Sequence, residues 1–131
     1  MKIERFEDIL AWQKARELSN LVYDAVEGDR FSRDFVLRNQ VTGAAGSVMH
    51  NIAEGYDSGY DAEFVRFLKL ARRSATEVQS ESYLALDRKY ITPDQFQNIY
   101  DKATETKKLI NAFIGYLNRG RKNPPNSPPS K

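Results

Sequence analysis

The sequence contains no cysteine and a single histidine, which excludes several classes of site. Disulfides, thiolate metal sites and thiol nucleophiles all need cysteine, and a site with two imidazole ligands needs a second histidine. No apolar run approaches the roughly 20 residues that a membrane-spanning helix needs. The N-terminus also lacks the basic-then-apolar order of a signal peptide. We therefore expect a cytoplasmic protein.

What the chain does contain is the composition of an ordinary globular domain. Its 131 residues fit one domain, and 40% of them are hydrophobic and 29% charged. The net charge is only +2, but it is unevenly spread. Residues 1–30 hold five basic and seven acidic side chains, whereas residues 91–131 hold seven basic and three acidic ones. This gradient permits a polyanionic partner without requiring one.

Apolar side chains recur at helical spacing in four segments, which run from Phe6 to Glu27, Ser32 to Glu54, Asp61 to Lys89 and Thr92 to Asn118. Because a helix turns by about 100° per residue, each segment presents one apolar face. Four such helices with short loops predict an all-α fold, an antiparallel up-down-up-down four-helix bundle, over residues 1–120. Residues 121–131 are basic and proline-rich, so we predict a disordered tail there.

Local signals predict where the helices begin and end. Ser32 and Asp61 are suitable N-caps for the second and third helices. Thr92 followed by Pro93 is a strong start for the fourth helix, because proline is favoured at the first helical position. Gly55 is expected to end the second helix, since glycine is common just after a helix C-terminus.

The second helix combines small residues with a polar row. Gly43 and Gly46 would each cost roughly 1 kcal/mol against alanine, which favours close approach of another backbone, with plain helix weakness as the alternative. Polar residues of this helix and the third fall beside the apolar faces and predict a hydrogen-bonded network that fixes helix pairing or a subunit contact. Its members are Gln40, Asn51, Glu54, Ser74 and Glu77.

Two aromatic side chains and one lysine do not fit the pattern of apolar faces. Trp12 and Tyr23 project to one side of the first face, which predicts an oligomer interface there, with a partly buried pair at the edge of the core as the alternative. Lys107 falls inside the fourth face, so its side chain either extends to solvent or meets an acidic group.

Three segments carry a family resemblance. The second helix ends in Asn51-Ile52-Ala53-Glu54-Gly55, the third contains Glu63-Phe64-x-x-Phe67-Leu68-x-x-Ala71-x-x-Ser74-x-x-Glu77, and the first opens with Phe6-x-x-Ile9-Leu10-Ala11-Trp12-Gln13-Lys14-Ala15. Together, over about residues 5–118, they resemble the four-helix-bundle proteins encoded in intervening sequences of bacterial large-subunit ribosomal RNA genes.

The resemblance implies a homopentamer of four-helix bundles around a central axis. It also implies a likeness to the accessory proteins of diversity-generating retroelements, which bind nucleic acid and a reverse transcriptase. The partners to expect are therefore further copies of the chain, RNA or DNA, and another protein such as a reverse transcriptase. Family members generally have no assigned enzymatic activity.

One departure from the family pattern concerns basic residues. The family usually carries them shortly after the glutamine of the second helix, where this chain has Thr42 and Gly43. Arg38, one turn earlier, replaces them in part. The basic residues that we predict to bind nucleic acid are Arg38, Arg66, Lys69, Arg72, Arg73, Arg119, Arg121 and Lys122. A solvated helix face explains Arg66, Lys69 and Arg73 equally well.

Two functions stay open at this point, and catalysis is the least favoured. The first is an oligomeric scaffold that binds nucleic acid, because clustered cations suffice to bind phosphates. The second is a protein–protein interaction adaptor with no nucleic-acid role. The sequence has neither the Glu-x-x-His motif of di-iron bundles nor a Gly-rich phosphate loop. We therefore expect no catalytic residue, metal or cofactor.

Overall fold

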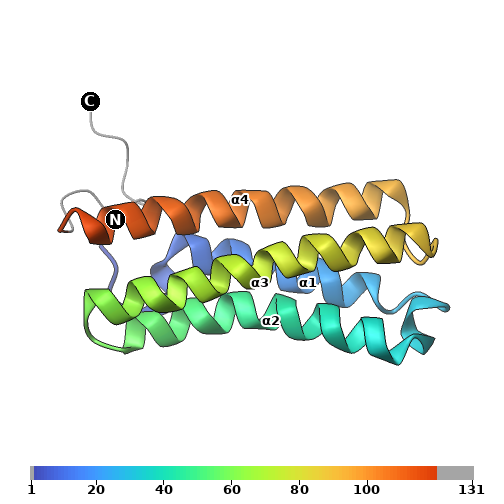
Figure 1. Cartoon of the computed structure of the whole chain (residues 1–131), viewed down its shortest axis with the longest axis horizontal. Helices are drawn as coiled ribbons and strands as arrows, with labels where there is room; N and C mark the ends of the chain where they lie inside the picture. The colour runs from blue at the N-terminus through green and yellow to red at the C-terminus, as the bar shows by residue number, and fades with distance from the viewer. Residues whose placement is uncertain (1, 121–131) are drawn as a thin grey trace.

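The computed structural model describes residues 2–120 and consists, over those residues, of helices joined by turns (Figure 1). The four long helices are α1 (Leu10–Ala25), α2 (Phe35–Asp57), α3 (Asp61–Asp87) and α4 (Pro93–Asn118). Short 3₁₀ turns, η1 (Phe6–Asp8) and η2 (Phe31–Arg33), precede α1 and α2. The prediction of an all-α fold is confirmed, and the predicted tail, residues 121–131, lies outside the described residues.

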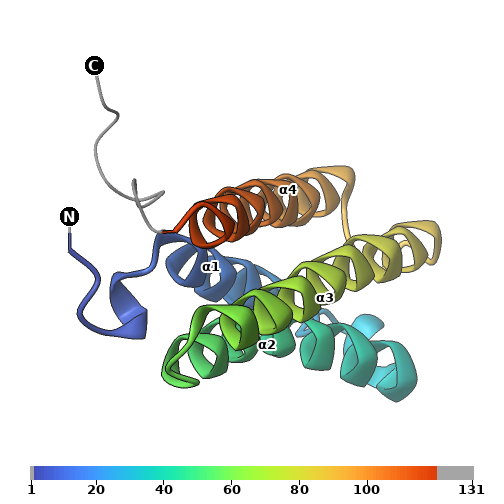
Figure 2. The same ribbon diagram turned by 60° about the vertical axis from the view of Figure 1, so that its left-hand side comes forward.

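The helices form an antiparallel bundle around one core. Successive helices lie side by side and are joined at alternating ends (Figure 1), and Figure 2 shows α4 against α1 and α3 against α2. The predicted apolar faces supply the core, with Leu18, Ile52, Leu68 and Ile110 fully buried. Each such side chain stabilises the fold by roughly 1.5–3 kcal/mol. Within residues 2–120, no helix is long and apolar enough to cross a membrane.

The predicted starts of the first two helices need correction. A continuous helix from Phe6 is wrong, because Ile9 has an extended backbone (φ −76°, ψ 119°) that separates η1 from α1. Asp34, not Ser32, caps α2, since its Oδ1 accepts a hydrogen bond from the Leu37 N–H at 3.1 Å. Ser32 lies inside η2 and its hydroxyl donates to the Asp29 carbonyl instead.

For the later helices, the predicted cap of α4 is confirmed and the predicted cap of α3 is wrong by one residue. The Thr92 hydroxyl accepts from the Gln95 N–H at 3.1 Å, and the Gln95 side chain accepts from the Thr92 N–H at 2.8 Å. This reciprocal cap, followed by Pro93, confirms the predicted start of α4. Asp61 is the first residue of α3 rather than its cap, a position held by Tyr60.

Gly55 does not end the second helix, which continues to Asp57. The residue is buried in α2 where the first turns of α3 pass closest to it. A Cβ at this position would lie 2.8 Å from Phe64 Cδ1 and 2.8 Å from Phe67 Cβ. The glycine therefore provides space for the neighbouring helix and is not a stop signal.

Candidate nucleic-acid interface

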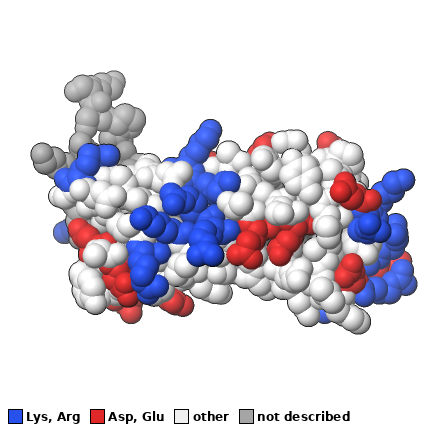
Figure 3. Space-filling view, in the orientation of Figure 1, with Lys and Arg blue, Asp and Glu red and all other residues white. Residues whose placement is uncertain are grey.

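A groove between α3 and α4 gathers the basic residues that are best placed to bind an anion. It has a volume of about 500 Å³ and is lined by Arg72, Arg73, Thr76 and Glu77 from α3, and by Lys107 and Asn111 from α4. Figure 3 shows basic side chains collected in the middle of this face, with acidic ones beside them. Three cations and one carboxylate leave the lining of the groove positively charged.

Two of the three cations are held in place by neutral groups. Arg72 Nη1 donates to Asn111 Oδ1 at 2.7 Å. Lys107 Nζ donates to Gln79 Oε1 at 2.7 Å and to Thr76 Oγ1 at 3.3 Å. Because none of these three partners carries a charge, both side chains are oriented and yet keep their full positive charge for a ligand.

Gln79 supports this arrangement from the buried side of the helix pair. Its Nε2 donates to the Tyr100 carbonyl at 3.2 Å and to Thr104 Oγ1 at 2.9 Å, which leaves Oε1 to accept from Lys107. The lysine that interrupts the fourth apolar face therefore meets an amide and a hydroxyl rather than an acid. One polar network both joins α3 to α4 and positions a cation at the surface.

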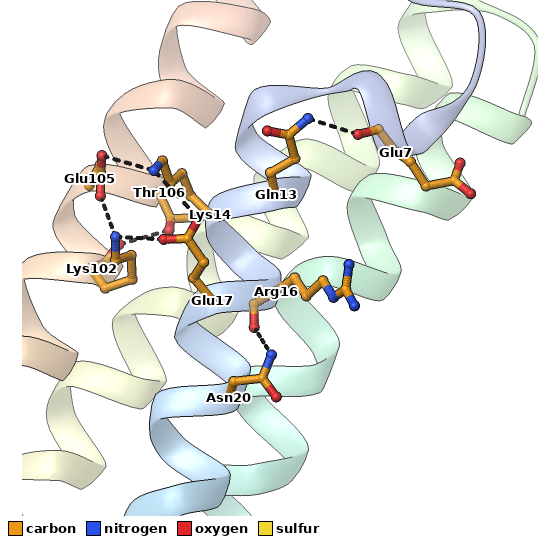
Figure 4. A network of polar contacts seen from close by, with 9 residues as sticks. All are labelled: Glu7, Gln13, Lys14, Arg16, Glu17, Asn20, Lys102, Glu105 and Thr106. Carbon is orange, nitrogen blue, oxygen red and sulfur yellow. Dashed lines mark hydrogen bonds and ion pairs between the residues drawn. The ribbon is translucent and has the colours of Figure 1, made fainter.

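Several of the other cations form ion pairs with carboxylates. Lys102 Nζ lies 2.9 Å from Glu17 and 3.0 Å from Glu105, and Lys14 is within 4 Å of the same two acids, in the α1–α4 network of Figure 4. Hydrogen bonds to Glu17 and Glu105 raise the pKa of Lys102, and the bond from Lys102 lowers the pKa of Glu17. This network joins two helices and leaves little charge to attract a ligand.

The acidic side chains beside the groove belong to one flank of α3. Glu77 is exposed at the groove, and Glu81 follows one turn later in the helix. Glu81 Oε1 is buried without a hydrogen-bond partner among the described residues. Burial, with a smaller contribution from the nearby charge of Glu77, raises the pKa of Glu81 to about 7.

This shift predicts a stability that falls as the pH rises. Between pH 4.5 and about 7 the folded protein keeps a proton on Glu81 that the unfolded chain releases, so the free energy of unfolding decreases across that window. Glu81→Gln, which cannot ionise, should remove this slope and be about 1 kcal/mol more stable than the wild type at pH 8, after allowance for solvent screening. Urea denaturation at pH 5 and pH 8 measures both effects, and parallel pH profiles would contradict the prediction.

Comparison with known proteins gives the family. Residues 7–112 match the family described as 23S rRNA-intervening sequence protein. The chain belongs to this family. It is also similar to a solved structure from Bacteroides thetaiotaomicron, a protein with unknown function from the S23 ribosomal protein family. The two are 25% identical with a TM-score of 0.73, over 80% of this chain and 98% of that one. No curated protein matches the sequence.

The family comparison names no enzyme, and the motifs behind the resemblance have structural roles here. Asn51 Nδ2 donates to the Ser47 carbonyl at 2.8 Å and to Ser47 Oγ at 2.9 Å, and Ser74 Oγ donates to Ser47 Oγ at 3.0 Å. With Gly55, these contacts hold α2 closely against α3. The family motifs of the second and third helices thus lie against each other where α2 packs on α3.

The predicted polar network is only partly formed. Asn51 and Ser74 belong to it and are joined through Ser47, which the sequence places in the same polar row of the second helix. The predicted members that do not join the network are exposed, and their side chains make no hydrogen bond within residues 2–120: Gln40, Glu54 and Glu77. Glu77 instead lines the groove between α3 and α4.

The predicted basic residues are distributed over several environments. Arg72 and Arg73 line the groove, and Lys69 lies exposed on the same helix. Arg66 pairs with Glu63 at 2.7 Å. Arg38 donates to the Ser32 carbonyl at 3.1 Å.

The remaining basic residues lie at the end of the chain or were not predicted. Arg119 is the C-cap residue of α4, and Arg121 and Lys122 lie outside the described residues. Sequence reasoning did not place Lys107 or Asn111 in the interface, although the interruption of the fourth apolar face was a signal for Lys107.

Trp12 and Tyr23 have different surroundings. Trp12 is half-buried by the chain's own N-terminal turn, where its ring packs edge-on against Phe6 at 5.1 Å between ring centroids. Tyr23 is 53% exposed. The alternative interpretation, a side chain covering the edge of the core, describes Trp12, while an oligomer interface at Tyr23 stays a prediction.

Proposed function

We propose that this family member is a non-enzymatic, self-assembling helical scaffold that binds nucleic acid, RNA or RNA/DNA, through the groove between α3 and α4. The observation that carries the proposal is the pair of cations, Arg72 and Lys107, which neutral partners orient without cancelling their charge. Arg73 adds a third cation to the same groove. Such an arrangement suits phosphate groups, whose recognition needs cations held in a fixed position.

The near-neutral net charge of the chain is compatible with this function. A single groove with three cations binds a polyanion weakly on its own. Several copies in one assembly would multiply that affinity, since a strand bound to one groove meets the next at high effective concentration. The resemblance to pentameric proteins supports an assembly of this kind.

Binding of a labelled, structured RNA measured by fluorescence anisotropy tests the proposal. For each groove that a strand engages, three cations predict that affinity falls about 20- to 40-fold between 50 and 200 mM salt, through release of condensed counterions. A complex that needs less than 50 mM salt, or whose affinity does not depend on salt, would contradict phosphate binding. Either result would favour the adaptor.

An adaptor role is the second candidate, because apolar side chains are exposed where α2 begins and α3 ends. Val36 is 70% exposed and Leu84 is 52% exposed, with Phe35 and Tyr83 beside them in the sequence. Exposed apolar side chains of this size are typical of contact surfaces. A contact surface at this end of the α2–α3 face is compatible with either function, and we propose that a second copy of the chain binds there.

Replacing Leu84 by glutamate should therefore disrupt the assembly. A charge at this position would have to be buried in the contact, at a cost of several kcal/mol. Light scattering should give a mass near five times the 15.0 kDa chain for the wild type and a smaller mass for Leu84→Glu. Tyr23→Glu tests in the same way the exposed aromatic side chain of α1, where the sequence predicts an oligomer interface. A monomeric wild type would contradict self-assembly, and an unchanged mass for Leu84→Glu would remove this surface from it.

A further inference from the structure

Glu77 is the one acidic residue among those that line the groove. It is exposed, and within residues 2–120 its carboxylate makes no hydrogen bond or ion pair. Arg73 stands four residues earlier on the same helix, a spacing at which opposite charges often pair, yet the two side chains do not form an ion pair here. The carboxylate is therefore available to a ligand.

A carboxylate is unfavourable in a site that binds phosphate alone, because it repels the anion that the cations attract. Its chemistry is that of an acceptor, so it gains energy only from a ligand that also carries an O–H or N–H group. A neutral lining residue, Asn111, adds hydrogen-bond donors to the groove. Asn111 uses its Oδ1 to orient Arg72 and keeps its amide N–H groups to donate.

The groove thus offers cations for an anion and, beside them, an acceptor for a hydroxyl. Its volume of about 500 Å³ exceeds what one phosphate fills and falls in the usual range of ligand sites. A ribose phosphate unit has both features, because each 2′-hydroxyl lies close to a backbone phosphate. DNA presents the same phosphates without the hydroxyl, which is the group that lets a protein tell RNA from DNA.

We propose that Glu77 makes the α3–α4 groove selective for RNA over DNA by accepting a hydrogen bond from a ribose 2′-hydroxyl while Arg72, Arg73 and Lys107 hold the adjacent phosphate. The inference rests on the proposed function and adds a specificity to it. In DNA the carboxylate meets no donor from the sugar and only repels the backbone. Discrimination therefore comes from a bond gained with RNA and a repulsion kept with DNA.

Three single strands of one sequence test the inference: RNA, 2′-O-methyl RNA and DNA, each titrated into the full-length protein and followed by fluorescence anisotropy. The wild type should bind RNA about 5- to 10-fold more tightly than the other two strands, the effect of one hydrogen bond to a charged group at an exposed site. Glu77→Ala should bind all three with similar affinity, and should bind DNA no more weakly than the wild type does. Glu54→Ala removes an exposed carboxylate from α2 and should keep the preference.

Each outcome of this experiment bears on a separate claim. Equal affinity of the wild type for the three strands, or a preference that survives Glu77→Ala, overturns the selectivity and leaves nucleic-acid binding intact. A loss of affinity for all three strands in Glu77→Ala also overturns it, since the carboxylate would then read base amino groups, which RNA and DNA share. If none of the strands binds, the inference fails, and the titration with structured RNA decides separately whether the proposed function stands.

Discussion

Replacing Arg72 and Arg73 by glutamine should weaken binding of structured RNA by about tenfold or more at 100 mM salt and reduce the slope of log affinity against log salt by about 2. Both residues line the groove, and Arg72 is already oriented by Asn111 at 2.7 Å. Glutamine is shorter than arginine, but it keeps a polar, hydrogen-bonding side chain and removes the charge. The effect should be largest in an assembled protein, where every copy loses two phosphate contacts.

A matched variant separates the groove from the general charge of the protein. Arg5→Gln with Arg33→Gln removes the same charge from two residues outside the groove that pair with Asp8 and Asp29. We expect this pair to change RNA affinity by no more than about threefold and to leave the salt slope nearly unchanged. Equal losses in the two double variants would show that binding depends on net charge and not on the groove.

Replacing Gly55 by alanine should destabilise the fold by about 1–3 kcal/mol, although alanine is the better helix former. The added Cβ would lie 2.8 Å from both Phe64 Cδ1 and Phe67 Cβ, and 3.3 Å from the Phe64 carbonyl oxygen. Neither Phe67 Cβ nor the α3 backbone can move aside without shifting the whole helix. Urea denaturation followed by circular dichroism measures the change in the free energy of unfolding.

The same substitution at Gly43 gives the control. Nothing lies within 4 Å of a Cβ built there, so Gly43→Ala should stabilise the protein by roughly 1 kcal/mol through helix propensity alone. The two variants therefore differ in sign although both exchange glycine for alanine in α2. A stabilising Gly55→Ala would contradict the close approach of α2 and α3 that the fold shows.

These two glycines show why the helices could be predicted and their contacts could not. The apolar faces and the cap at Thr92 are local patterns, so four helices follow from the sequence. Gly55 looked like a helix end because glycine serves equally at a C-terminus and in a tight helix crossing. The deciding information is the position of Phe64 and Phe67 on another helix.

The same limit applies to the candidate site. The cluster on α3 was visible in the sequence, since Arg72 and Arg73 are adjacent to one another. Lys107 and Asn111 were not assigned to it, because which residues of α4 face them depends on the register of two helices joined by a turn. The role of Gln79, which orients Lys107 at 2.7 Å, follows only from that register.

Lysine footprinting in the presence and absence of RNA tests the central claim most directly. The proposal places Lys107 in the bound groove, whereas Lys89 follows the C-terminal end of α3 and does not line the groove. Saturating RNA should slow acylation of Lys107 several-fold and leave the rate at Lys89 unchanged. Equal protection of the two lysines, or protection of Lys89 alone, would contradict a nucleic-acid site between α3 and α4.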